Sequence, residues 1–348
     1  MAFEKLNGAA VPKIEMTELR LLADQLEATD SGTMFHQYKT LIEDGDIVVV
    51  YLNPGSMLAT TVRAGEMLNN KYGSFRHNDM IGLKYGSMVK SHVGSGFVYL
   101  LHPTPALWTQ VVPHRTQILY LPDISFISMY LDLKPGKVVL ESGTGSGSFS
   151  HSLARTIAPT GHLYTFEYHE LRAETARKEF IEHKLTDVVT IEHRDVLANG
   201  FGKVGIADAV FLDLPAPWDA IAAAKEALRR DTTGRVCSFS PCIEQVQRTA
   251  LALDEHGFSD IRMYECLVRD YETRTLPMPD IEEAINGQKI SFKPNKNEQK
   301  KRKLESGMST PAGEGGASPE IMISKPVDQA RGHTSYLTFA ILAPEVDN

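Results

Sequence analysis

One short stretch limits what this chain can fold into more than any other part of it. Residues 138–140 are apolar, and the loop soon after them has glycine at every second position, at Gly143, Gly145 and Gly147. A helix-like segment, 148–155, follows at once. This order is typical of the first strand, turn and helix of a βαβ unit, in which ligands bind at the carboxyl ends of the strands. We therefore predict an α/β protein with a doubly wound sheet; the alternative for the loop alone is a plain tight turn.

The spacing of the glycines separates two classes of ligand. Dinucleotide-binding folds use G-x-G-x-x-G, which presents a helix N-terminus to a pyrophosphate. Here the third glycine comes one residue early, and Ser148 stands where the last glycine of that pattern belongs. Glu141 also places a carboxylate beside the loop, where we expect a negative charge that repels phosphate. The pattern favours a cationic or zwitterionic ligand without phosphate, for which S-adenosylmethionine is the natural candidate.

The chain after residue 120 alternates helix-like and strand-like segments. We predict strands at 162–167, 188–192, 209–213, 235–239, 261–268 and 336–342, and helices at 123–133, 170–183, 218–228 and 243–253. Five strand–helix repeats followed by a final pair of strands match a doubly wound sheet.

The remaining sequence divides into segments of different composition. Residues 1–33 hold one helical pattern among acidic residues, and we expect a flexible extension. Residues 34–105 contain short strand-like runs that predict a small β-barrel-like domain. Residues 106–348 then form the Rossmann-like domain, with an insertion at 279–332 that has too little apolar content to offset its ordering entropy and should be disordered. Its basic cluster at 300–303 suits a nuclear import signal, an RNA contact or a solvated loop equally.

Composition excludes several classes of protein. No apolar run reaches the ~20 residues that a membrane helix needs. The three cysteines are too few for a disulfide framework and lack zinc-ligand spacing, so we expect a reducing intracellular location and no metal. The formal net charge of -8 argues against a lone nucleic-acid binder, because phosphate contacts need Lys and Arg. Either the substrate is not nucleic acid, or a partner chain supplies the basic surface.

Candidate site residues fall at the carboxyl ends of four successive predicted strands. After the glycine loop, Glu167 ends the second strand, where a carboxylate can accept hydrogen bonds from both hydroxyls of a ribose. Asp195 follows the third strand and is placed to accept from an adenine amino group. Asp213 ends the fourth, next to where a reactive methyl group would lie. This register predicts a methyltransferase, against a nicotinamide dehydrogenase or a non-catalytic Rossmann module.

Two prolines stiffen the segment that Asp213 opens. Pro215 and Pro217 fix φ and keep the chain extended as far as Trp218. Such a segment can hold a carboxylate and an aromatic ring against a flat base. The alternative is a stiffened strand exit with Trp218 simply buried.

Several motifs together are similar to those of one enzyme family. They are the run from Glu141 to Gly147, the run from Asp213 to Trp218, the sequence His-Arg-Thr-Gln at 114–117 and the closing segment 332–339. Their combination resembles the catalytic subunit of eukaryotic tRNA adenine-N1-methyltransferase, over about residues 34–278 and 331–343. The intact glycine loop distinguishes this chain from the related subunit of that family, which has lost the cofactor motifs.

The resemblance implies a fold, an activity and a set of partners. It implies a class I methyltransferase that uses S-adenosylmethionine to methylate N1 of the T-loop adenosine, position 58 of tRNA. It also implies a nuclear heterotetramer with a related, non-catalytic RNA-binding subunit. By motif match, the expected cofactor contacts are Gln117, Leu119, Glu141, Gly143, Thr144, Gly145, Ser146, Gly147, Ser148, Glu167, Arg172, Asp195, Val196 and Asp213.

Asp213 is also the expected catalytic carboxylate. Candidate contacts to the base or tRNA are Pro215, Trp218, His114 and Arg274, although His114 and Arg274 suit ordinary structural or solvent-facing roles as well. Two other functions fit part of the pattern: a class I methyltransferase that acts on a protein or small molecule, and a non-catalytic RNA-binding subunit.

Overall fold

A computed structural model describes residues 35, 38–53, 55–277, 285, 320–327 and 335–345. The predictions for residues 1–33 and for the basic cluster at 300–303 lie outside this part of the chain. The chain divides into two compact units, with residues 267–333 forming the smaller one. None of the helices described here is long and apolar enough to cross a membrane.

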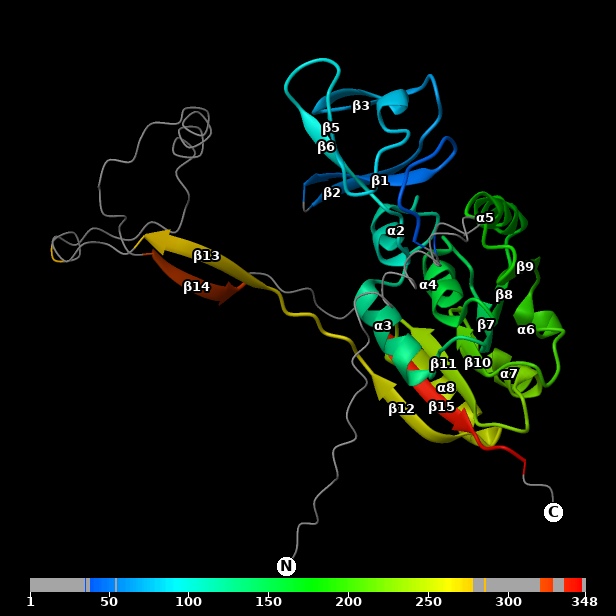
Figure 1. Cartoon of the computed structure of the whole chain (residues 1–348). Coiled ribbons are helices and arrows are strands. Elements are labelled where there is room, and N and C mark those ends of the chain that lie inside the picture. The colour runs from blue at the N-terminus through cyan, green and yellow to red at the C-terminus, as the bar shows by residue number, and fades with distance from the viewer. Residues whose placement is uncertain are drawn as a thin grey trace, which may run out of the picture. The chain divides into compact units, whose positions relative to one another are not determined.

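The larger unit is built around a seven-stranded sheet with the order β12-β15-β11-β10-β7-β8-β9 (Figure 1). Its strands are β7 (Val138–Ser142), β8 (His162–Glu167), β9 (Val189–His193), β10 (Ala209–Leu212), β11 (Gly234–Ser240), β12 (Ser259–Tyr264) and β15 (Tyr336–Leu342). The first five strands in chain order run parallel, and β15 lies antiparallel to both β11 and β12. The predicted doubly wound sheet is confirmed, although its sixth strand ends at Tyr264 rather than at 268.

Helices cover both faces of this sheet. They are α2 (Pro105–Val111), α3 (Leu121–Tyr130), α4 (Ser148–Ile157), α5 (Glu170–Glu182), α6 (Val196–Asn199), α7 (Ile221–Ala227) and α8 (Ile243–Glu255), with a 3-10 turn, η2 (Pro217–Ala220), before α7. The central strands are apolar at successive positions because both of their faces are buried. On β7, Val139 packs in the core under α2 to α5, while Leu140 packs in the core under α6, α7 and α8.

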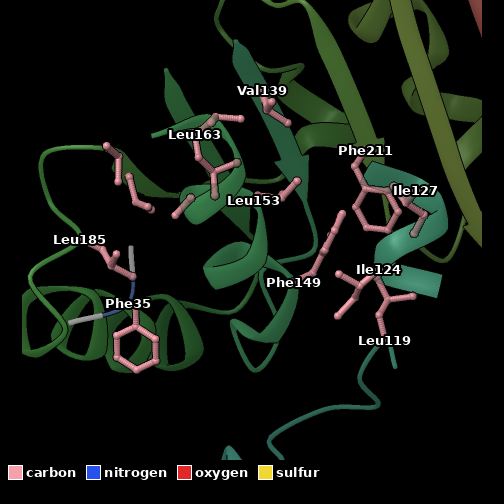
Figure 2. Close-up of a cluster of buried hydrophobic side chains, with 14 of the residues drawn as sticks. Phe35, Leu119, Ile124, Ile127, Val139, Phe149, Leu153, Leu163, Leu185 and Phe211 are labelled. Atoms are coloured by element: carbon pink, nitrogen blue, oxygen red, sulfur yellow. The ribbon is translucent and has the colours of Figure 1, made fainter. Parts of the chain in front are cut away.

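The first of these cores reaches from the sheet to the outer helices (Figure 2). At one end, Phe149 of α4 meets Phe211 of β10 edge to face, with ring centroids 4.7 Å apart. At the other end lie Phe35, from the start of the described chain, and Leu185. This core therefore fixes α4, and with it the loop that connects β7 to α4.

The β-rich region forms a four-stranded antiparallel sheet with the order β2-β1-β6-β5, and a separate hairpin. The strands are β1 (Ile47–Asn53), β2 (Ser56–Thr61), β5 (Met88–Lys90) and β6 (Phe97–Leu101), and the hairpin is β3 (Met67–Asn70) with β4 (Gly73–Arg76), followed by the 3-10 turn η1 (His77–Asp79). Within the described residues, the region predicted to be β-barrel-like consists of this four-stranded sheet and the hairpin. It has a core of its own, and Ile47 also packs in the larger core.

The smaller unit contains an antiparallel ribbon of β13 (Tyr271–Pro277) and β14 (Glu320–Pro326). Because β14 lies inside the segment 279–332, the prediction that this whole insertion is disordered is wrong. The strand forms because Ile321, Met322 and Ile323 pair across the ribbon with Leu276, Thr275 and Arg274, which satisfies their backbone groups.

Candidate cofactor and active site

The carboxyl ends of five parallel strands open onto one cavity of about 770 Å³. Gly143 follows β7, Glu167 ends β8, Asp195 follows β9 and Asp213 follows β10, and all four line this cavity. The structure therefore brings together the four strand ends that the sequence pattern singled out.

The glycine loop is shaped by its packing against neighbouring backbone. Gly143 has φ +99°, and a Cβ there would lie 2.3 Å from the carbonyl oxygen of Asp213. Gly145 has φ +54°, and a Cβ there would lie 2.6 Å from Oγ1 of Thr116. Both positions need glycine for two reasons, the left-handed backbone and the lack of space. The loop therefore needs glycine at these positions to pass close to Asp213 and Thr116.

Residues 115 and 116, which are distant in sequence, form hydrogen bonds with the glycine loop. The hydroxyl of Ser146 accepts hydrogen bonds from the backbone N–H groups of Arg115 (2.9 Å) and Thr116 (3.1 Å). The Nε of Arg115 donates to the carbonyl of Gly145 (3.4 Å), and its guanidinium forms a two-pronged ion pair with Glu179 of α5. The loop is therefore tied to α5 through one arginine.

Glu167 ties the loop to the second strand. Its Oε2 accepts from the backbone N–H of Gly145 (3.0 Å), and its Oε1 accepts from the backbone N–H of His169 (3.0 Å). Arg172 donates to the same Oε1 from Nη2 (2.7 Å) and Nε (3.0 Å). Arg172 lines the cavity and is the partner that neutralises the charge of Glu167.

Asp195 begins helix α6. Its Oδ1 accepts from the backbone N–H groups of Leu197 (3.0 Å) and Ala198 (3.2 Å) as the helix cap. Oδ2 has no hydrogen-bond donor among the described residues. Val196 lines the cavity beside it.

Two further carboxyl groups lie in less polar surroundings. Burial raises the pKa of Asp213 to about 6, and the negative charge of Glu167 adds to this rise. Glu141 is fully buried and accepts a hydrogen bond from the hydroxyl of Ser150 (2.5 Å), and burial raises its pKa to about 8. Glu141 is therefore mostly neutral at pH 7, which corrects the expectation of a negative charge at this position.

The other predicted residues fall into separate groups. Gln117, Leu119 and Pro215 line the large cavity, whereas Glu141, Thr144, Ser146 and Ser148 line a space of about 20 Å³ behind the loop and Gly147 lines neither. The hydroxyl of Ser148 donates to Thr109, and that of Thr144 pairs with Thr165.

Three of the four candidate substrate contacts lie outside the cavity lining or outside the described atoms. His114 is exposed. Trp218 packs against Arg248 of α8, whose guanidinium carbon lies 5.0 Å from the ring centroid. Its partner sits 30 residues further along the chain, so the sequence pattern alone did not reveal it. The side chain of Arg274 lies outside the part of the chain that the structure describes.

The sequence pattern missed some residues that support the glycine loop and some that line the cavity. Arg115 and Thr116 belong to the His-Arg-Thr-Gln motif, but nothing in the sequence showed that they contact the loop. Pro241 and Gln245 follow the fifth strand, and the rule that ligands bind at strand ends would have found this position. Tyr168 and Arg194 also line the cavity, directly after β8 and β9.

The residues that line the cavity fit S-adenosylmethionine better than a dinucleotide. The N-terminus of α4, formed by Gly147 and Ser148, does not line the large cavity, so it offers no pyrophosphate site there. The cavity lining has three carboxyl groups, Glu167, Asp195 and Asp213, against two arginines, Arg172 and Arg194, and this excess of acidic groups suits a ligand with positive charge. Within the described residues, no group of His, Cys, Asp and Glu is placed to hold a metal ion.

Comparisons with known proteins agree with this geometry. The family described as "tRNA methyltransferase complex GCD14 subunit" matches residues 96–342. A protein of Candida albicans named tRNA (adenine(58)-N(1))-methyltransferase catalytic subunit TRM61 is 42% identical, over 89% of this chain and 99% of its own length. A Dictyostelium discoideum protein named as the corresponding catalytic subunit, trmt61a, is 43% identical, over 87% of this chain and 97% of its own.

Two solved structures share the fold. A SAM-dependent O-methyltransferase from Thermotoga maritima has a TM-score of 0.67 at 26% identity, and covers 89% of this chain and 97% of its own. The tRNA (m1A58) methyltransferase TrmI from Aquifex aeolicus has a TM-score of 0.60 at 23% identity, with coverage of 86% and 97%. The sheet and its helices thus form the Rossmann-like fold of class I methyltransferases.

Proposed function

Because the chain belongs to the family of the GCD14 subunit of the tRNA methyltransferase complex, we propose that it is a catalytic subunit that moves a methyl group from S-adenosylmethionine to N1 of adenosine 58 of tRNA. The convergence of Gly143, Glu167, Asp195 and Asp213 on one cavity carries this proposal.

S-adenosylmethionine, when bound, supplies an electrophilic methyl group on a sulfonium. We assign to Glu167 the hydrogen bonds from ribose hydroxyls, which is supported by the bond from the backbone N–H of Gly145 that holds this carboxylate at the cavity. We assign to Oδ2 of Asp195 the hydrogen bond from the adenine amino group, because Asp195 lines the cavity and its Oδ1 is taken by the cap of α6. The cavity volume of about 770 Å³ lies within the range of small-molecule sites.

Asp213 acts on the base to be methylated. N1 of adenine carries an in-plane lone pair at neutral pH, so no general base is needed before attack. The carboxylate accepts a hydrogen bond from the exocyclic amine and stabilises the positive charge that grows on the ring. Its pKa of about 6 leaves it ionised at neutral pH.

The substrate must come out of its own fold to reach this site. In folded tRNA the N1 edge of the T-loop adenosine is engaged in a tertiary pair, so the nucleotide is extruded at a cost of a few kcal/mol. Holding the base in line with the methyl group supplies much of the remaining rate enhancement.

The proposal includes a partner and a location. With a formal net charge of -8, this chain is poorly suited to hold tRNA by itself. We place it in a heterotetramer with a related, non-catalytic RNA-binding subunit that supplies basic surface, and in the nucleus.

Methyl transfer to defined tRNA tests the activity. The chain is co-expressed with the related subunit and given labelled S-adenosylmethionine and transcribed tRNA, and the product is mapped by reverse-transcriptase stops. We expect a stop at position 58 and no label on tRNA that carries guanosine there. Label on a protein or small molecule, with none on tRNA, would favour the first alternative, and failure of the chain to bind S-adenosylhomocysteine would favour a non-catalytic subunit.

A further inference from the structure

Two buried histidines lie directly behind the glycine loop. His151 of α4 and His183, at the C-terminal end of α5, are 0% and 2% exposed. Nδ1 of His151 lies 2.6 Å from the carbonyl oxygen of Gly147, and its Nε2 lies 2.7 Å from Nδ1 of His183. Neither residue lines the large cavity, and methyl transfer does not need them.

The chemistry of these contacts fixes the direction of both hydrogen bonds. A carbonyl oxygen can only accept, so Nδ1–H of His151 donates to Gly147. In a neutral ring, Nε2 of His151 then carries no proton and accepts from Nδ1–H of His183. Burial lowers the pKa of His151 to about 4 and that of His183 to about 2, which keeps both rings neutral. The result is a directed chain from His183 through His151 to the loop.

An aromatic cage keeps water away from this chain. The ring centroid of Phe35 lies 4.8 Å from that of His151 and 4.5 Å from that of His183. The ring centroid of Trp108 lies 4.7 Å from that of His183, and Phe180 packs against His151. Phe35 therefore packs against both histidine rings.

The acceptor is the residue where the loop becomes helix. Gly147 has φ 72° and begins α4 without a side-chain cap. Its carbonyl oxygen accepts both Nδ1–H and the backbone N–H of His151, the latter at 3.2 Å, while its own N–H donates to Thr144 (2.8 Å). The histidine ring therefore adds a second donor at the carbonyl that joins the loop to the helix.

We propose that His151 and His183 are positioning residues, which hold the glycine loop in its cofactor-binding shape before the cofactor arrives. The inference rests on the proposed function for its effect on cofactor affinity, but the effect on the loop itself does not depend on it. A preformed loop binds more tightly because less ordering is needed on binding.

The test compares variants that keep or remove the donor. His151→Asn retains an N–H near the position of Nδ1, whereas His151→Leu does not. His256→Leu is the matched control. Nδ1 of His256 lies 2.8 Å from the carbonyl oxygen of Ala252, which is also four residues before it in the chain. His256 is far from the loop in sequence and does not line the cavity. If His151→Leu does not fold, a second pair of variants replaces it. His183→Asn keeps an N–H that can donate to His151, whereas His183→Leu removes it.

Hydrogen exchange is measured on the amides of residues 143–148 without cofactor. We expect exchange to be faster by about tenfold in His151→Leu, as for one lost buried hydrogen bond, and close to wild type in His151→Asn and His256→Leu. The Kd for S-adenosylhomocysteine should rise by a similar factor in His151→Leu, while kcat at saturating cofactor changes less than about twofold.

Unchanged loop exchange in His151→Leu, or equal acceleration in His151→Asn and His151→Leu, would overturn the inference. Wild-type protein that does not bind S-adenosylhomocysteine would instead refute the proposed function, and the exchange comparison would still decide whether the histidines hold the loop.

Discussion

Asp213 contributes to the site through two parts of the same residue. Its backbone N–H donates to Ser142 at 2.9 Å, and its carbonyl oxygen lies where a side chain at Gly143 would have to go. Its carboxylate faces the cavity in surroundings that raise its pKa. The backbone of Asp213 therefore contacts the glycine loop, and its carboxylate is the group to which the proposed function assigns the chemistry.

Removing that carboxylate should separate chemistry from cofactor binding. We expect Asp213→Ala to lower kcat by about 10²–10³-fold, because one preorganised electrostatic contact is lost. The Kd for S-adenosylhomocysteine should stay within a few-fold of wild type, as measured by isothermal titration. Asp213→Asn is the control for shape: it should be nearly as inactive, because the charge rather than the volume stabilises the ring. Near-normal turnover in either variant would remove Asp213 from the catalytic role.

The same residue sets a pH dependence. A carboxyl group with a pKa of about 6 is protonated below that pH and then neither accepts from the amine as an anion nor offsets positive charge. The kcat/KM should therefore fall as the pH drops through about 6 and reach a plateau above it, since this constant reports groups of the free enzyme. The residual activity of Asp213→Asn should lack that inflection. A wild-type profile flat from pH 5 to 7 would contradict this assignment.

At the scale of the elements, the β7–α4 loop depends on supports from several parts of the chain. Arg115 and Thr116 hold Ser146, Glu167 holds Gly145, and His151 holds Gly147. The sheet brings the loop, Glu167 and Asp213 together, because they lie at the carboxyl ends of the neighbouring parallel strands β7, β8 and β10.

Gly143→Ala tests whether the loop has room for any side chain. The added Cβ would lie 2.3 Å from the carbonyl oxygen of Asp213, so the backbone must shift at Asp213. We expect kcat/KM to fall by about 10²-fold, as a shift of about 1 Å can do. Gly65→Ala is the matched control, since Gly65 has φ +88° and nothing within 4 Å of the added atom. That control should lose only about 1–2 kcal/mol of stability by thermal unfolding and keep its activity. Equal activity in the two variants would show that the loop tolerates the shift.

The sequence pattern predicted the elements better than their partners. The positions of the strands along the chain and the acidic residues at their ends follow from local signals, since apolar runs and the residues after them can be read in sequence. The neutral state of Glu141 could not be read, because it depends on burial beneath α4 rather than on the residue type. Arg115 with Glu179, and Trp218 with Arg248, are pairs that only the folded chain brings together. The strand β14 was missed because its short apolar run is stabilised by pairing with β13.

At the scale of the whole molecule, the cavity suits methyl transfer, whereas the negative charge of the chain does not suit tRNA binding. The four strand ends line one cavity of this chain, whereas the formal net charge is -8. The proposed function therefore assigns the chemistry to this chain and the holding of tRNA, which needs cationic surface, to the related subunit.

We expect the chain alone to bind tRNA at least about tenfold more weakly than the complex with its related subunit, and with a shallower dependence on salt, because it neutralises fewer phosphates. Filter binding at several salt concentrations measures both quantities. Binding of S-adenosylhomocysteine to the chain alone and to the complex serves as the control and should be similar. A lone chain that binds tRNA as tightly as the complex would contradict the proposed division of tasks.

The crystal structure of the chain with S-adenosylhomocysteine bound tests most directly whether the strand ends form a methyl-transfer site. We predict the ligand in the large cavity, with its ribose hydroxyls on Glu167, its adenine amino group on Asp195 and its sulfur facing the carboxylate of Asp213. A ligand bound elsewhere, or Asp213 turned into the protein interior or toward bulk solvent, would contradict it.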